Sequence, residues 1–186
     1  MRLKKFVFAA VMVACVSFAG YAENRDHARN AIGLRAGAGL SWGPELQYQR
    51  FLGDANRLEL GAGMEGMILI NDDFYIGYVM TGTYQWWTGS KNTIWYAGPS
   101  AGIGVFTGGI IEGIFNTITH KEVDTSGNFA VRVGGQAGVQ YDFSKTWLRL
   151  PLNMSFDIRP MSNFMIGNAK TVSFIFSAGL SARVVF

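Results

Sequence analysis

The sequence predicts an all-β fold, an eight-stranded antiparallel up-and-down transmembrane β-barrel. The first observation is the end of the chain, where apolar residues alternate with small or polar ones from Val172 to Phe186. This period of two indicates a strand with one apolar and one polar face. The second observation is that seven earlier segments share this alternation and carry most of their charges on one face. The third is that aromatic residues gather at the segment ends. A closed membrane barrel needs such a lipid-facing stripe and leaves no open edge.

The start of the chain has the pattern of an export signal. Basic residues precede an apolar run over 6–19, and small residues lead to Ala22. This run is shorter than the roughly 20 residues of a membrane-spanning helix. We therefore predict a signal peptide over 1–22, cleaved after Ala22. The alternative is a lipoprotein signal in which Cys15 is the lipidated residue.

Removal of this signal changes the charge balance. It holds three of the 16 Lys and Arg residues and none of the 13 Asp and Glu residues, so the rest of the chain is formally neutral. The single cysteine also lies in the signal, which leaves no thiol or disulfide chemistry. A neutral chain gives no electrostatic reason to expect nucleic-acid binding. We predict a polar leader over 23–30 and one barrel domain over 31–186.

The first four predicted strands are each defined by outward apolar residues. The strands and their outward residues are 31–41 (Ile32, Leu34, Ala36, Ala38 and Leu40), 43–52 (Leu46 and Tyr48), 56–69 (Leu58, Leu60, Ala62, Met64 and Ile68) and 74–87 (Phe74, Ile76, Tyr78, Met80, Tyr84 and Trp86).

The last four predicted strands repeat this pattern, and the seventh alternates most regularly of the internal ones. They are 93–106 (Trp95, Ala97, Ala101, Ile103 and Val105), 128–142 (Phe129, Val131, Val133, Ala137, Val139 and Tyr141), 147–159 (Leu148, Leu150, Leu152, Met154, Phe156 and Ile158) and 172–186 (Phe174, Phe176, Leu180, Val184 and Phe186).

The other face of these strands carries the charges. The interior of an eight-stranded barrel is filled by side chains, and unpaired buried charges are costly. We therefore expect salt bridges across the lumen, supported by Gln47, Gln49, Gln136 and Gln140. The alternative is a narrow polar pore. The expected network consists of Arg35, Glu45, Arg57, Glu59, Glu65, Arg132, Arg149, Asp157, Arg159 and Arg183.

Aromatic residues predict the two membrane boundaries, where amphipathic rings lie at the headgroups. A β-sandwich core is the alternative, although it would not gather rings at strand ends. The girdle at the turn and C-terminal end comprises Trp86, Trp87, Trp95, Tyr141, Trp147 and Phe186, and the opposite girdle comprises Trp42, Phe74, Phe106 and Phe129.

Connections of different length predict the orientation. Outer-membrane barrels have short periplasmic turns and longer outer loops, and an even strand number puts both termini on the periplasmic side. The short connections are 53–56, 88–92 and 143–146, and those on the other side are 41–43, 71–73, 107–127 and 160–171.

Three stretches carry a family resemblance, namely WYAGPSAGIG at 95–104, LPLNMSFDIRP at 150–160 and SARVVF at 181–186. With them the chain resembles the small outer-membrane barrels related to OmpA and OmpX, and most of all the outer-membrane β-barrel domain common in Bacteroidetes. The resemblance implies the outer membrane of a Gram-negative bacterium and contact with its lipids. It also implies that Phe186 is read by the barrel assembly machinery.

Candidate catalytic residues are few. A lipid-modifying esterase would need a histidine, a serine and a carboxylate at the membrane surface. His120, Ser126 and either Glu122 or Asp124 fall in the long loop, but no nucleophile motif surrounds the serine, and His27 lies in the leader. The stretch 124–128 offers oxygen ligands for Ca²⁺ but is more typical of a turn. We expect no enzyme, no cofactor and no metal site.

The remaining prediction is a structural or surface-interaction role through the outer loops. The 107–127 loop mixes isoleucines with glycines, so it either binds a surface protein by strand addition or covers the barrel mouth. A narrow channel for small solutes and a lipid-modifying enzyme are the alternative functions.

Overall fold

A computed structural model describes residues 30–52, 55–68, 74–90, 92–108, 127–146, 150–167 and 171–186. The predicted signal peptide, its cleavage site at Ala22 and the leader up to residue 29 lie outside these residues. Asn30, which the sequence placed in the leader, begins the first strand.

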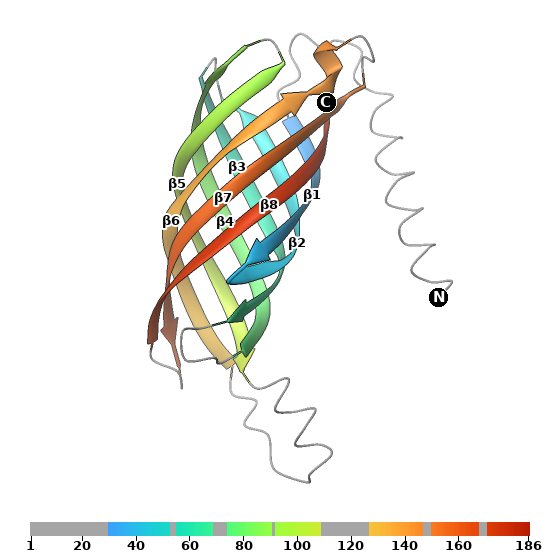
Figure 1. The fold of residues 1–186 in the computed structure, drawn as a ribbon. Coiled ribbons are helices and arrows are strands. Elements are labelled where there is room, and N and C mark those ends of the chain that lie inside the picture. Colours follow the sequence, from blue (N-terminus) through green and yellow to red (C-terminus); the bar gives the residue numbers. More distant parts are fainter. Residues whose placement is uncertain are drawn as a thin grey trace, which may run out of the picture.

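Eight strands form a closed barrel in which each strand is antiparallel to its neighbours (Figure 1). The last strand pairs with the first, so the sheet closes, and this confirms the predicted fold class. The strands are β1 (Asn30–Gly39), β2 (Ser41–Phe51), β3 (Asn56–Ile68), β4 (Phe74–Gly89), β5 (Thr93–Gly108), β6 (Gly127–Asp142), β7 (Leu152–Ile166) and β8 (Thr171–Val185).

Both ends of the barrel domain lie at one end of the barrel, called here the terminus end. The backbone N–H of Asn30 donates to the carbonyl of Phe186 at 3.1 Å, and the N–H of Phe186 donates back to Asn30 at 2.9 Å. A short 3-10 helix, η2 (Phe143–Lys145), follows β6 at this end, and the Asp142 carboxylate accepts from the backbone N–H of Ser144 at 2.9 Å. The opposite end is called the loop end.

The barrel wall is uneven in height at the loop end. β1 and β2 have 10 and 11 residues, whereas β4, β5 and β6 have 16 each. The β1–β2 connection turns at Leu40, next to Gly39, whose φ of 130° favours glycine. The β1–β8 ladder ends at Gly39 and Ser177, but β8 begins at Thr171. β8 therefore extends beyond its β1 partner, as Figure 1 shows.

The seventh strand differs from the prediction in position. β7 covers Leu152–Ile166 instead of 147–159, so part of the expected 160–171 loop is strand. The alternation continues past Pro160, because Met161 and Met165 are buried and Phe164 is exposed. Pro160 keeps its place opposite β8, and the ladder with β6 is interrupted at Arg159 and Pro160. Pro160, which has no backbone N–H to donate, falls at this interruption of the β6 ladder, so proline does not end the strand.

The two faces of the barrel have opposite character. Large apolar side chains are exposed on the outer face, for example Leu180 (62% exposed) and Phe156 (47%). The inner face buries arginines and carboxylates, among them Arg183 and Asp157 at 0% exposure. This polarity is the reverse of a water-soluble barrel, in which apolar side chains are removed from water.

Helices contribute little to the described structure. Across the residues that the structure describes, no helix is both long enough and apolar enough to cross a membrane.

Candidate functional site

The inner face divides into two regions along the barrel axis. The polar layer lies between the terminus end and the middle of the barrel, and the apolar layer lies toward the loop end. The polar layer comprises Arg35, Glu45, Gln47, Gln49, Arg57, Glu59, Gln85, Gln136, Gln140, Asp157, Arg159 and Arg183. The apolar layer comprises Met67, Tyr75, Val79, Phe106, Ala130, Met161, Met165 and Ile175.

Glu59 on β3 is the centre of the polar layer. Its carboxylate is 2% exposed and accepts from Arg159 Nη2 at 2.8 Å and from Arg183 Nη2 at 3.1 Å. The amides of Gln47, Gln49 and Gln136 donate to it at 3.2, 2.6 and 3.1 Å. These five donors come from β2, β6, β7 and β8. One carboxylate on β3 therefore joins four other strands by hydrogen bonds inside the lumen.

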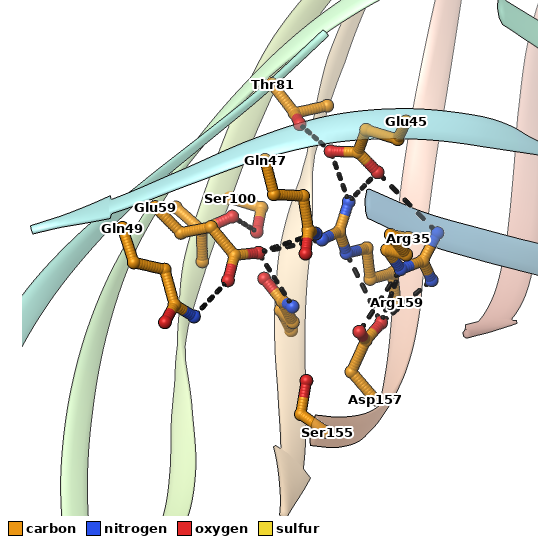
Figure 2. Close-up of polar contacts among 12 residues, drawn as sticks. Arg35, Glu45, Gln47, Gln49, Glu59, Thr81, Ser100, Ser155, Asp157 and Arg159 are labelled. Atoms are coloured by element: carbon orange, nitrogen blue, oxygen red, sulfur yellow. Dashed lines mark hydrogen bonds and ion pairs between the residues drawn. The ribbon is translucent and has the colours of Figure 1, made fainter. Parts of the chain in front are cut away.

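Arg159 on β7 is the matching cation. It donates to Glu45 on β2 at 2.8 Å and to Glu59 at 2.8 Å, and its Nε lies 3.4 Å from Asp157 (Figure 2). Arg35 on β1 donates twice to Asp157, at 2.8 Å from Nη2 and 3.0 Å from Nε. Thr81 donates to Glu45 at 3.1 Å. Buried charges in this layer are therefore compensated by shared partners, as their burial requires.

Glycines make room for these charged groups. A Cβ at Gly179 on β8 would collide with the guanidinium of Arg35, and one at Gly61 on β3 would collide with the carboxylate of Glu45. The two glycines thus leave the space into which Arg35 and Glu45 extend, because neither position could hold a side chain without displacing a charged group.

Two further arginines close the layer toward the terminus end. Arg183 donates to Gln47 at 3.0 Å and to Ser155 at 2.9 Å besides Glu59. Arg57 donates to Gln85 and, at 2.7 Å, to Gln140, and its guanidinium carbon lies 4.1 Å from the Tyr96 ring centroid.

Arg57 therefore differs from the other arginines of the layer. Within the described part of the chain it forms no ion pair with a carboxylate. Two amides and the face of an aromatic ring stabilise its charge instead.

The apolar layer fills the lumen toward the loop end. Phe106 and Met67 are fully buried, and Ile175 is 2% exposed. One ion pair lies within this region, because Arg132 donates to both carboxylate oxygens of Glu65 at 2.7 Å. The sequence did not predict this layer, because its inward apolar residues alternate with small or polar ones such as Asn163 and Ser173.

A small cavity lies where the two layers meet. It encloses about 40 Å³ and is lined by Arg35, Glu45, Arg132 and Met161 among others. A water needs about 10–15 Å³ of such volume, so the cavity has room for a few waters.

The predicted lumen residues are largely brought together. Arg35, Glu45, Arg57, Glu59, Asp157, Arg159 and Arg183 belong to the polar layer, and Glu65 and Arg132 form the separate pair toward the loop end. Arg149 lies outside the described residues. The sequence reasoning missed Gln85 and Thr81, whose inward positions follow from the same alternation, whereas Ser155 faces inward as predicted.

The predicted girdle residues fall on two faces. Trp86, Trp95, Tyr141 and Phe186 are exposed at 55%, 61%, 40% and 36%. Trp87 needs correction, because it follows the outward Trp86 and is half-buried on the inner side of β4, with its ring 6.2 Å from that of Phe51.

Three other aromatic residues of the predicted girdles either face inward or have no described side chain. Phe106, expected at the opposite girdle, is likewise inward and buried in the apolar layer. Trp147 is outside the described residues, and the side chain of Phe74 is not described.

The candidate catalytic and loop residues cannot be placed. His27, His120, Glu122, Asp124 and Ser126 lie outside the described residues, as does the 107–127 loop apart from its ends in β5 and β6. Among the described residues, no group of three or more histidine, cysteine or acidic side chains is arranged to hold a metal ion.

Comparison with known proteins supports the architecture. No family model matches the chain, and no curated protein matches it. The fold is similar to the crystal structure of Neisserial surface protein A (NspA), with a TM-score of 0.52 and 14% identity, over 85% of this chain and 95% of that chain. At this identity the likeness shows the fold alone, a small closed barrel. The closer resemblance to the OmpA and OmpX group stays a prediction.

Proposed function

We propose that this protein is a closed, non-conducting barrel of the Gram-negative outer membrane that presents its loop end for contacts at the cell surface. The observation that carries the membrane assignment is the reversed polarity of the wall. Leu46, Leu180 and Phe156 are about half exposed on the outside, whereas Glu59 and Arg183 are buried inside. A continuous exposed apolar surface of this kind is stable in lipid and unfavourable in water.

The strand lengths support the orientation. β1 and β2, with 10 and 11 residues, match the roughly 9–11 residues of a membrane-crossing strand. The longer β4–β8 then extend beyond the membrane at the loop end. The β8 backbone beyond Phe176 lacks a β1 partner, and an open edge is excluded from the hydrocarbon region. The terminus end, with its short turns, then faces the periplasm.

The closed lumen supports an anchor rather than a channel. Side chains from every strand cross the polar layer or fill the apolar layer, and Glu59 alone joins four other strands. A solute would have to break several buried ion pairs to pass. A lipid-modifying enzyme has no supporting observation among the described residues.

The unpaired part of β8 supports a contact role. Val172 and Phe174 are 69% and 55% exposed beyond the end of the β1–β2 hairpin. An exposed strand edge with apolar side chains is a template for strand addition by another protein. The 109–126 connection begins and ends at the same loop end, since it joins β5 to β6.

One substitution tests the membrane assignment. Leu180→Arg on the outer face should lower the free energy of unfolding in lipid vesicles by about 3 kcal/mol, because a charge at the bilayer midplane is costly. Thr88→Arg, at the terminus end of the outer face, is the control and should cost less than about 1 kcal/mol. Equal effects of the two arginines would contradict the membrane position.

Electrical recording tests closure. The purified full chain, inserted in a planar bilayer, should show no stable conductance. A large and steady conductance of the wild-type protein would refute the non-conducting assignment.

Photo-crosslinking in intact cells tests the contact role. A photoreactive amino acid at position 174 should give adducts with other proteins, whereas one at position 156, on the lipid face, should not. Equal protein adducts at the two positions would refute a contact role for the β8 edge.

A further inference from the structure

We propose that a groove on the outer wall, across β5 and β6 near the terminus end, binds one acyl chain of a membrane lipid. This proposal rests on the proposed membrane location. The groove is open on its outer side and has a volume of about 570 Å³, within the size range of small-molecule sites. Its floor includes Ala97 and Ala137, Trp86 lies at one side, and Phe156 and Ile158 lie at the other.

The strand register explains the shape of the groove. Trp86 on β4 pairs with Ala97 on β5, Ala97 pairs with Ala137 on β6, and Ala137 pairs with Ile158 on β7. One row of outward residues therefore runs large, small, small and large across four adjacent strands. The two alanines leave a trough between the two large side chains.

The next outward row toward the loop end, which lies beyond the lining of the groove, also carries small side chains at its centre. There Pro99 pairs with Gly135. A Cβ at Gly135 would meet only the Gly98 carbonyl, at 3.4 Å, so the space above it is open. Small residues therefore continue from the groove toward the membrane middle, which is the direction of a lipid tail.

The lining identifies the occupant. It carries no charged side chain, and Thr88 contributes its one hydroxyl side chain apart from Tyr96. Trp95 lies at its terminus end and Trp86 at one side, at 61% and 55% exposure, and indole rings near a barrel end lie at the level of lipid headgroups. An unfilled apolar trough forfeits dispersion contacts on one side, and an acyl chain restores them. A headgroup at the indoles with its tail in the trough satisfies both ends of the site.

Lipid photolabelling tests this assignment. The full chain would be reconstituted in phosphatidylethanolamine–phosphatidylglycerol vesicles that contain a trace of phosphatidylcholine with a diazirine in its acyl chain. After illumination and digestion, mass spectrometry should find adducts concentrated on the peptides that carry Ala97 and Ala137, above those at Leu46 and Leu180, which are also exposed.

Two matched variants sharpen the test. Ala137→Phe fills the trough and should remove the excess labelling on β5 and β6. Ala62→Phe, the same substitution at an exposed outward alanine of β3, should leave the labelling pattern unchanged.

Every other pattern overturns the proposal in a distinguishable way. Even labelling around the wall, or excess labelling that survives Ala137→Phe, would mean ordinary surrounding lipid only. Peptides with Ala97 and Ala137 that stay unlabelled while those with Leu46 and Leu180 are labelled would mean that protein, such as a second copy of the chain, covers the groove. Absence of labelling at Leu46 and Leu180 as well would refute the membrane location itself.

Discussion

The polar and apolar layers fill the same lumen by different physics. In the polar layer, Glu59 and Arg159 each need several partners in fixed positions, since a buried charge that loses a partner is left uncompensated. In the apolar layer, Phe106 and Met161 need only volume and contact, which neighbouring side chains can partly restore. The polar layer therefore constrains which strands face one another across the lumen, whereas the apolar layer fills the remaining space.

The largest expected effect is at the centre of the polar layer. Glu59→Gln removes the negative charge that two arginines share, so it should lower the free energy of unfolding by about 4 kcal/mol, as when a buried pair is broken. Urea unfolding in lipid vesicles measures it. Glu65→Gln is the control, because Glu65 is 16% exposed and has one arginine partner. An equal loss for both variants would contradict a shared centre at Glu59.

The next effect is in the apolar layer. Phe106→Ala should cost about 3 kcal/mol, because it leaves a cavity among buried side chains. The neighbouring outward variant Val105→Ala, where lipid fills the space, should cost much less in the same unfolding experiment. Phe106→Ala should also remain non-conducting in a planar bilayer, since the polar layer is intact. A new conductance would show that the apolar layer is the actual seal.

A glycine of the polar layer gives a smaller effect. Gly179→Ala should cost about 2 kcal/mol, because its Cβ displaces the Arg35 guanidinium from Asp157. Gly82→Ala, whose Cβ would meet only a Leu60 methyl at 3.6 Å, is the control and should be nearly neutral. In an Arg35→Met background the Gly179→Ala penalty should shrink. A penalty that persists there would show backbone strain instead.

The smallest effect is a swap of similar volume in the apolar layer. Met161→Leu should cost less than about 1.5 kcal/mol in unfolding, since such cores tolerate changes of shape at constant volume. Arg183→Lys in the polar layer should cost more, because one ammonium cannot replace a guanidinium that donates to Gln47, Ser155 and Glu59. The opposite order would remove the distinction between the layers.

Much of the fold was predictable because strand alternation is a local property. Eight segments and their faces follow from the sequence, and the structure confirms a closed eight-stranded antiparallel barrel. Errors arose where the pattern was ambiguous. In the Trp86–Trp87 pair only one ring can face outward, and the alternation around Pro160 continues in both directions, so the bounds of β7 were wrong.

The partners within the lumen were beyond the sequence. Inward positions were readable, but the pairing of Arg159 with Glu45 and Glu59 depends on how strands stagger around a closed barrel. Gln85 carried the same inward signal as Gln136, yet its contact with Arg57 joins residues far apart in the chain.

Local pattern is therefore enough to identify eight strand segments and the charged side of each one. Each segment shows the two-residue period of a strand, and this period is visible without any knowledge of the other segments. The closed sheet alone decides which charges meet, where the lumen becomes apolar, and where two alanines become a groove. Those features arise when residues distant in the chain are brought to the same height on neighbouring or facing strands.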